Sequence, residues 1–529
     1  MNFKQIMKIF FYLIFFSFIS LASQEPNEKK LNLIYSGLDT TSIKQHLAFY
    51  ELYPDSEKGR QALKDAWNII TNENNLKFAI NQSLPFSTNF IHALISLVNK
   101  QDKKELPILS NEQLLEIEKI GFVLKHKQLK GHRCLDEQEV LKLPYSQIDL
   151  ARGLFLTEMG TDYQRIRSYE ALLDIMALQI MARLPKNASP TQIIYEINYL
   201  IFDEMEFRFP PHSTFKENID KYTFLPSVLD THQGVCLGVS IIYICLAQRL
   251  GLEMEAITPP GHIYVRYRDE HTIINVETTA RGIHLDSEEY LSIDTHDLQI
   301  RNVKEVIGMA HFNQAAVYWQ KKDYQGAYQA YLKAQPYLFH DPLLKEFMGY
   351  TLLFINRKEE GEKLLYEIKD SIPSFAMTNS TIANDYFQEN IDAEGIKIIF
   401  LNSEKERSAL LKQKDSIEAV LEKYPHFRAG LIQLAMIWVK LHHHEKALEI
   451  FKKYHRLNPS EPEVNYYLAI LYFSRLNYTA AWYHLQKSEK FVNSKNYYPK
   501  ILKELRAQLL IKCPECTQEN YYENLYTYR

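Results

Sequence analysis

The sequence is poor in the residues that define several structural classes. Among 529 residues, cysteine occurs five times, glycine 17 times and proline 20 times. So few cysteines exclude a disulfide scaffold. Scarce glycine and proline beside 35 tyrosines and 28 phenylalanines exclude a collagen-like chain and favour mostly helical architecture. The net charge is only −4, and because nucleic-acid-binding proteins usually carry a strongly basic face, we predict no nucleic-acid partner.

Long apolar runs are also scarce, apart from one near the start. Lys4 and Lys8 precede an apolar run over residues 9–22, which small and polar residues follow. This pattern is typical of a secretory signal peptide, and the run is short for a transmembrane helix. We predict that residues 1–23 are a signal and that the mature protein is exported, periplasmic or secreted, without stable membrane insertion. An uncleaved N-terminal anchor is the alternative.

A 34-residue period marks the C-terminal half. Ala447 and Phe451 are followed 34 positions later by Ala481 and Leu485. A small residue lets two helices approach closely, and a large one fills the space between them. This spacing resembles the tetratricopeptide repeat, with a generic helical bundle as the alternative.

The repeat resemblance covers residues 306–375 and 405–490. Residues 376–404 break the phase, and we expect an irregular helix pair there. We predict an α-solenoid over residues 301–495 and a C-terminal tail over 496–529. Stacked repeats offer a surface for a protein or peptide partner.

The middle of the chain carries a candidate nucleophile. Cys236 follows Gly234 and opens an apolar stretch that stops at Gly251, which predicts a helix with the thiol in its first turn. The helix dipole there favours a thiolate. Cys245 lies half a turn out of phase with Cys236, so we predict a buried structural thiol.

A Pro-Pro-Gly-His turn ends at His262 and leads into two β-rich stretches, residues 263–267 and 272–277. They predict a hairpin. A two-residue Asp-Glu turn places His262 directly opposite Glu277, although this pair is not favoured in such turns and the loop could be longer. The carboxylate would then orient the imidazole and stabilise its protonated form.

These residues suit covalent catalysis. Cys236 would act as nucleophile, His262 as general base and Glu277 as the group that orients His262. The Cys236 backbone N–H and Gln233 are candidate donors to an oxyanion. Asn275 shares the predicted face of Glu277 and is a possible accessory residue.

This order and spacing resemble the transglutaminase-like superfamily of Cys-His-Asp enzymes, and more narrowly the bacterial SirB-type proteins that carry tetratricopeptide repeats after the core. The shared stretches are residues 200–204 with Phe207, 226–229, the Cys236 helix ending at 249–252, 260–266, and Glu277 with Gly282. Two features depart from the pattern. Glu277 stands where Asp is usual, and Cys236 is present where many SirB-type relatives lack the cysteine.

The resemblance implies an α+β fold with a papain-like, transglutaminase-like core and a small antiparallel sheet over residues 146–300. A helical region over residues 24–145 would precede it, and the solenoid would follow. We expect no cofactor and no metal ion.

Three further motifs are weaker. Cys513 and Cys516 have the spacing of a redox or metal knuckle, and in an exported chain we expect a local disulfide, with metal binding as the alternative. The triplet His442-His443-His444 is expected in a solvated inter-helix turn, and Cys134 is expected to be inert.

Two functions therefore compete. One is an exported cysteine enzyme, a peptidase, amidase or acyltransferase, which attacks an amide through a thioester while the repeats recruit its substrate. The other is a non-catalytic scaffold for protein–protein interaction, because a fold does not by itself imply chemistry.

Overall fold

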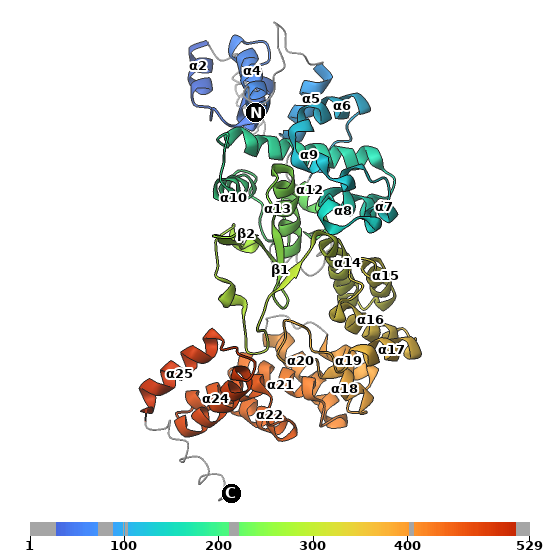
Figure 1. The fold of residues 1–529 in the computed structure, drawn as a ribbon, viewed down its shortest axis with the longest axis vertical. Coiled ribbons are helices and arrows are strands. Elements are labelled where there is room, and N and C mark those ends of the chain that lie inside the picture. Colours follow the sequence, from blue (N-terminus) through green and yellow to red (C-terminus); the bar gives the residue numbers. More distant parts are fainter. Residues whose placement is uncertain are drawn as a thin grey trace, which may run out of the picture. The chain divides into compact units, whose positions relative to one another are not determined.

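The computed structural model describes residues 28–71, 88–98, 100, 104–210, 222–400 and 407–514 (Figure 1). The predicted signal, residues 1–23, and Cys516 lie outside the described residues. None of the described helices combines the length and apolar character needed to cross a bilayer. The chain divides into two compact units, the first formed by Met1–Leu124 and Tyr163–Glu196, the second by Lys125–Asp162 and Ile197–Arg529.

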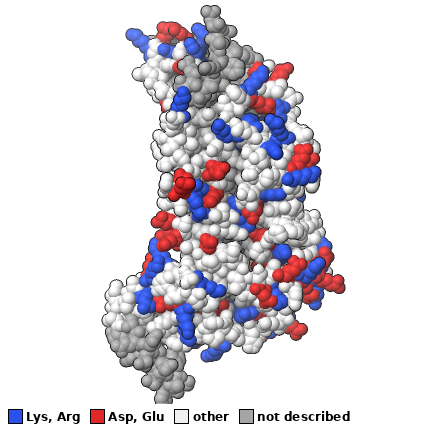
Figure 2. All heavy atoms as spheres, viewed as in Figure 1, with Lys and Arg blue, Asp and Glu red and all other residues white. Residues whose placement is uncertain are grey.

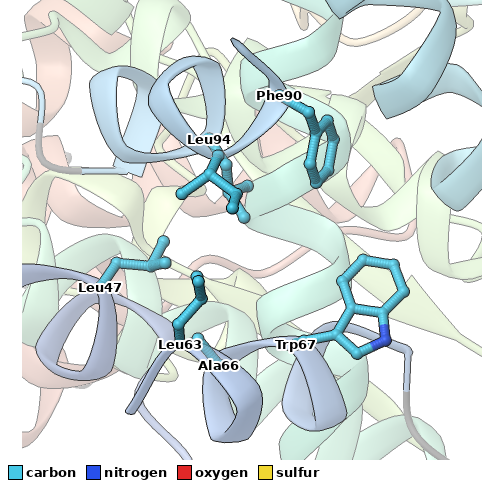
Figure 3. A pocket seen from close by; sticks show the side chains of 7 residues that line it. Leu47, Leu63, Ala66, Trp67, Phe90 and Leu94 are labelled. Carbon is cyan, nitrogen blue, oxygen red and sulfur yellow. The ribbon is translucent and has the colours of Figure 1, made fainter. Parts of the chain in front are cut away.

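The first unit is helical. Side-chain caps define its helix starts: Ser42 accepts the Gln45 N–H, and Ser110 and Gln113 form a capping box. Its helices are α2 (Glu28–Ser36), α3 (Ile43–Leu52), α4 (Glu57–Thr71), α5 (Thr88–Val98), α6 (Asn111–Ile120) and α9 (Tyr163–Arg183). Apolar side chains of α3, α4 and α5, among them Leu47, Trp67 and Phe90, surround a small hollow (Figure 3). Its lining is hydrophobic, which is typical of an imperfectly filled core.

The second unit begins with helical segments and a four-stranded antiparallel sheet in the order β3-β2-β1-β4. Its first helices are α7 (Glu137–Lys142), α8 (Leu150–Met159), α12 (Leu225–Thr231) and α13 (Cys236–Leu250), and α10 (Pro190–Asn198) begins in the first unit. The strands are β1 (Glu255–Thr258), β2 (Tyr264–Arg268), β3 (Ile273–Val276) and β4 (Gln299–Arg301). Helix α13 packs against β2, so the predicted nucleophile and the predicted hairpin belong to one α+β core.

The predicted two-residue turn of the hairpin is wrong. Val265 pairs with Val276 and Arg268 with Ile273, so four residues connect the strands. The reason lies in Asp269, whose carboxylate accepts the N–H groups of His271 and Thr272 and thereby builds the longer loop. Compared with the predicted register, each residue of β3 is displaced by two positions, which keeps its side chains on the predicted face.

Most of the remaining helices of the unit form pairs: α14 with α15, α16 with α17, α21 with α22, and α23 with α24. Their bounds are α14 (Val303–Gln320), α15 (Tyr324–Ala334), α16 (Pro342–Phe354), α17 (Lys358–Ile368), α21 (Arg428–Lys440), α22 (His444–Leu457), α23 (Pro462–Ser474) and α24 (Tyr478–Asn493). The remaining helices are α18 (Ile382–Phe387), α19 (Ala393–Ile399), α20 (Arg407–Lys423) and α25 (Lys500–Lys512). The short helices α18 and α19 are the irregular pair expected where the phase breaks.

The repeat period also appears in the backbone. Within the paired helices, a left-handed residue recurs in the inter-helix turns 34 positions apart, at Lys322 and Asn356 and again at His442 and Leu476. The exposed histidine triplet therefore spans the end of such a turn, as expected, with His442 in the turn and His444 at the start of α22. Ala447 and Ala481 are fully buried where their helices meet. The predicted combination of an α+β core that has a small antiparallel sheet with a helical solenoid is confirmed. On the face shown in Figure 2, basic and acidic side chains are interspersed.

Candidate active site

Cys236 is the first residue of α13. The residue before it, Val235, offers no side-chain cap, which leaves the first N–H groups of the helix without that partner. Gly234 is required by packing, because a Cβ there would lie 2.8 Å from the Val239 side chain. At the other end, Gly251 adopts the left-handed conformation (φ 77°) that ends the helix, as predicted.

The three described free cysteines differ in environment. Cys236 is partly exposed, whereas Cys134 and Cys245 are buried. Burial raises the pKa of both Cys134 and Cys245, which disfavours their thiolates. Cys245 is thus the buried thiol expected from its phase on the helix, and Cys236 is the accessible one.

His262 is presented by a tight turn. Its N–H donates to the Pro259 carbonyl at 3.0 Å, and Gly261 has a φ of 72°, which favours glycine. The imidazole Nε2 lies 2.7 Å from Glu277 Oε2, and the Cys236 thiol is hydrogen-bonded to the same ring. Since Glu277 engages Nε2, the other ring nitrogen, Nδ1, is the one left for the thiol.

Glu277 accepts four hydrogen bonds. Oε1 receives the Thr279 N–H and hydroxyl, at 3.0 and 2.5 Å, and Oε2 receives His262 and the Tyr290 hydroxyl, the latter at 2.5 Å. Burial raises the pKa of Glu277, but its hydrogen bonds with His262, Thr279 and Tyr290 outweigh this effect and lower the pKa to about 2. The group is therefore a fixed carboxylate at neutral pH.

The pKa of His262 responds in the opposite direction. Burial lowers it, but the hydrogen bonds to Cys236 and Glu277 more than offset burial and raise it to about 9. An imidazole in this setting holds its proton at neutral pH, so the geometry favours a proton on the ring beside the thiol.

The longer side chain of Glu277 suits its position. Extending the observed register places Glu277 opposite Tyr264, with His262 two residues further along the same face. Diagonal neighbours on a sheet lie about 7–8 Å apart, with their Cβ atoms somewhat closer, whereas directly opposed Cβ atoms are about 5 Å apart. The extra methylene of glutamate, compared with the usual aspartate, contributes reach across this longer gap.

Tyr290 and Thr279 are site residues that the sequence reasoning missed. Tyr290 ends the short 3₁₀ helix η8 (Ser287–Tyr290), and its ring stacks on Tyr264 at 4.6 Å and on His262 at 5.8 Å. No periodic pattern marks this loop. Thr279 could have been found from its proximity in sequence, because it follows Glu277 by two residues.

The two accessory candidates occupy different settings. The Asn275 amide donates to the Leu285 carbonyl and the Ser287 hydroxyl, so it supports the loop that carries Tyr290 rather than His262 itself. Gln233 is held through its backbone, with its N–H on the Thr231 hydroxyl and a bridge to Arg208. Its role as an oxyanion donor stays a prediction.

Among the described residues, His126, His132 and Asp149 have ligand atoms within 4.8 Å of one another, close enough for one metal ion. Asp149 already accepts the Ala151 N–H at the start of α8 and lies 3.1 Å from His132. Burial raises the pKa of Asp149, but His132, His126 and Arg249 together lower it well below its usual range. Because Arg249 adds positive charge here, we interpret the group as a structural helix cap.

Comparison with known proteins supports the core. A family model described as the transglutaminase-like superfamily matches residues 167–303. This match contains Cys236, His262 and Glu277, and it establishes a transglutaminase-like domain in the chain.

Curated relatives match a small part of the chain. F-box only protein 21 of Mus musculus is 24% identical over 126 residues, and the Homo sapiens protein is 23% identical over 126 residues. In both cases the alignment covers 22% of this chain and 18% of the relative. The chain therefore spans about a fifth of the length of the curated relatives it matches.

Solved structures match more loosely. A thermophilic TPR protein of Thermus thermophilus shares 16% identity at a TM-score of 0.20, covering 39% of this chain and 99% of that one. A structure of menin shares 10% identity at a TM-score of 0.34, covering 75% and 91%. These TM-scores are too low to indicate a shared fold. The solenoid is inferred instead from the helix pairs of the structure.

Proposed function

We propose that the chain is an exported transglutaminase-like cysteine enzyme of the SirB type, which attacks amide or peptide bonds through a thioester, while its repeats recruit a protein partner. One observation carries the catalytic part: a single imidazole contacts both a partly exposed thiol at a helix start and a buried carboxylate with four donors.

In the proposed reaction, His262 holds the proton of Cys236, and the sulfur attacks the amide carbonyl carbon. The C–S bond forms and the C–N bond breaks as His262 transfers its proton to the leaving amine. His262 then deprotonates water or an acceptor amine, which attacks the thioester and returns the thiol. The N–H groups at the start of α13, with Gln233, would stabilise the oxyanion.

The test is labelling with a thiol-directed acyl probe. The unmodified chain and a Cys245→Ala control are expected to label, and Cys236→Ala is not. Labelling of Cys236→Ala equal to the control would reject the enzyme. A Cys236 that alkylates no faster than a free thiol would favour the scaffold instead. Export is tested separately by whether residues 1–23 are removed from the secreted chain.

A further inference from the structure

One segment of the second unit contacts both the sheet and the last repeat helices. We call residues 291–298, which connect η8 to β4, the strap. Its ends lie at the sheet, where Leu298 packs with Ile257 and Tyr264, and the strap starts directly after Tyr290. Figure 1 shows the chain running from the sheet towards α24 between these points.

The middle of the strap is buried in the repeats. Ile293 is only 2% exposed and belongs to the same apolar cluster as Trp482 and Leu485 of α24 and Leu502 of α25. An aliphatic side chain enclosed in a pocket in this way can anchor a bound segment.

The strap backbone pairs with the repeats beside a turn that the Ser292 N–H and the Thr295 carbonyl close at 3.1 Å. Thr295 forms an antiparallel bridge with Ala376, the His296 N–H donates to the Phe375 carbonyl at 3.0 Å, and the Met377 N–H donates to the Asp294 carbonyl at 2.7 Å. Residues 375–378 lie around the point where the repeat phase breaks. Pairing of this kind is how an added strand binds a domain, with affinity from the main chain and specificity from side-chain pockets.

Side chains complete the contact. The Asp294 carboxylate accepts the Thr378 N–H and hydroxyl, at 2.9 and 2.6 Å. The Tyr497 hydroxyl donates to the carbonyls of Ser292 and Thr295, at 3.0 and 3.2 Å. The surface therefore recognises an aliphatic residue followed by a side-chain oxygen acceptor.

We propose that residues 375–378 with α23, α24 and α25 form a peptide-binding surface that the strap occupies in cis, and that a protein partner presenting a segment of the same chemistry displaces it.

The strap is not an optimal ligand for this surface. Asp294 faces Glu461 and Glu463 at the start of α23; burial, Asp294 and Glu461 together raise the pKa of Glu463 to about 7. Like charges oppose docking. A partner with asparagine at the Asp294 position keeps the acceptor for Thr378 without the charge, so it is expected to bind more tightly than the strap sequence.

Displacement of the strap would also affect the catalytic centre, and this consequence rests on the proposed function. Tyr290 donates to Glu277 and immediately precedes the strap, and the adjacent Glu289 pairs with Lys500 of α25. A partner that removes the strap would loosen one of the four donors that fix Glu277.

The first test is binding of a fluorescent peptide with the sequence of residues 289–299 to the full chain carrying Cys236→Ala. Adding Ile293→Asp to the chain removes the internal competitor, so affinity is expected to rise about tenfold or more. The same peptide with Ile293→Asp is the control and should not bind. Equal affinity for both chains, or no binding, would overturn the proposal.

A second measurement needs no altered strap. With saturating peptide, backbone amides of the strap in the Cys236→Ala chain should exchange hydrogen faster, while those of residues 375–378 stay protected. Unchanged strap exchange would reject displacement. Neither measurement depends on turnover. An unreactive Cys236 would therefore contradict the proposed enzyme function without contradicting the peptide-binding surface.

Discussion

His132 and Asp149 lie 3.1 Å apart, and His262 and Glu277 lie 2.7 Å apart. Both carboxylates are buried, and both have a lowered pKa. Asp149, however, caps α8 through backbone N–H groups, and its histidine packs edge-on against His126. The His262 ring instead contacts a partly exposed thiol.

Because only one of the two histidines contacts a thiol, a histidine–carboxylate pair is not in itself a catalytic feature. What separates the two pairs is the neighbour of each ring, because the side chains of His262 and His132 are similarly exposed, at 25% and 17%. The neighbour of His262 is the Cys236 thiol, whereas the neighbour of His132 is His126. We therefore expect substitutions in the His262–Glu277 pair to affect catalysis and substitutions in the His132–Asp149 pair to affect stability.

The largest effect is expected from the nucleophile. Cys236→Ala should lower turnover or probe labelling by about a thousandfold or more, because the thioester cannot form. Mass spectrometry of the labelled chain measures this loss. Cys245→Ala, on the same helix, should retain labelling, and a comparable loss in that variant would contradict the assignment.

The second largest effect is expected when the negative charge of Glu277 is removed. Glu277→Gln should lower turnover about 100-fold, since the ring loses its orienting carboxylate. The His262 pKa of about 9 predicts an inflection near pH 9 in Cys236 alkylation, because the imidazolium loses its proton there. Without the negative charge, this inflection should move to lower pH. An unmoved profile would disprove the coupling.

The other pair should affect stability instead. Asp149→Asn should lower the free energy of unfolding by about 1–3 kcal/mol through the weakened cap and buried hydrogen bond. Because the folded pKa of Asp149 is lowered, its contribution is present above the unfolded pKa of about 4 and disappears as pH falls. Denaturant unfolding at several pH values measures this. If Asp149→Asn lost Cys236 labelling without unfolding, the purely structural role of the His132–Asp149 pair would be contradicted.

The smallest effect is expected from Tyr290→Phe, which keeps the stacked ring but removes one of four donors to Glu277. Turnover should fall about threefold to tenfold, consistent with one hydrogen bond of about 1 kcal/mol. Tyr264→Phe is the matched control, since its hydroxyl contacts Ser287 rather than Glu277. Equal effects in both variants would indicate a packing role only.

The sequence allowed much of this site to be anticipated, even with the wrong register. A displacement of two residues keeps every side chain on its face, so His262 and Glu277 still meet. The start of α13 at Cys236 followed from Gly234, Gly251 and the apolar stretch between them. The solenoid followed from a small residue recurring every 34 positions.

Tyr290 and the strap could not be predicted in this way. Both lie in a loop without helical or strand periodicity, and their partners are distant in sequence, such as Met377 and Trp482. Contacts of this kind depend on tertiary packing, which a local pattern does not encode. The broken repeat phase around residues 376–404 was visible, but nothing indicated that Ala376 pairs with Thr295.

The four-residue connection after β2 has an evolutionary consequence. Connection length and acid length compensate for each other here: the same chain closed by two residues in place of four would shift β3 by two positions and set position 277 across from position 262, where aspartate reaches and glutamate overshoots. Among homologues with hairpins of equal length, aspartate is therefore expected with the two-residue connection and glutamate with the four-residue connection.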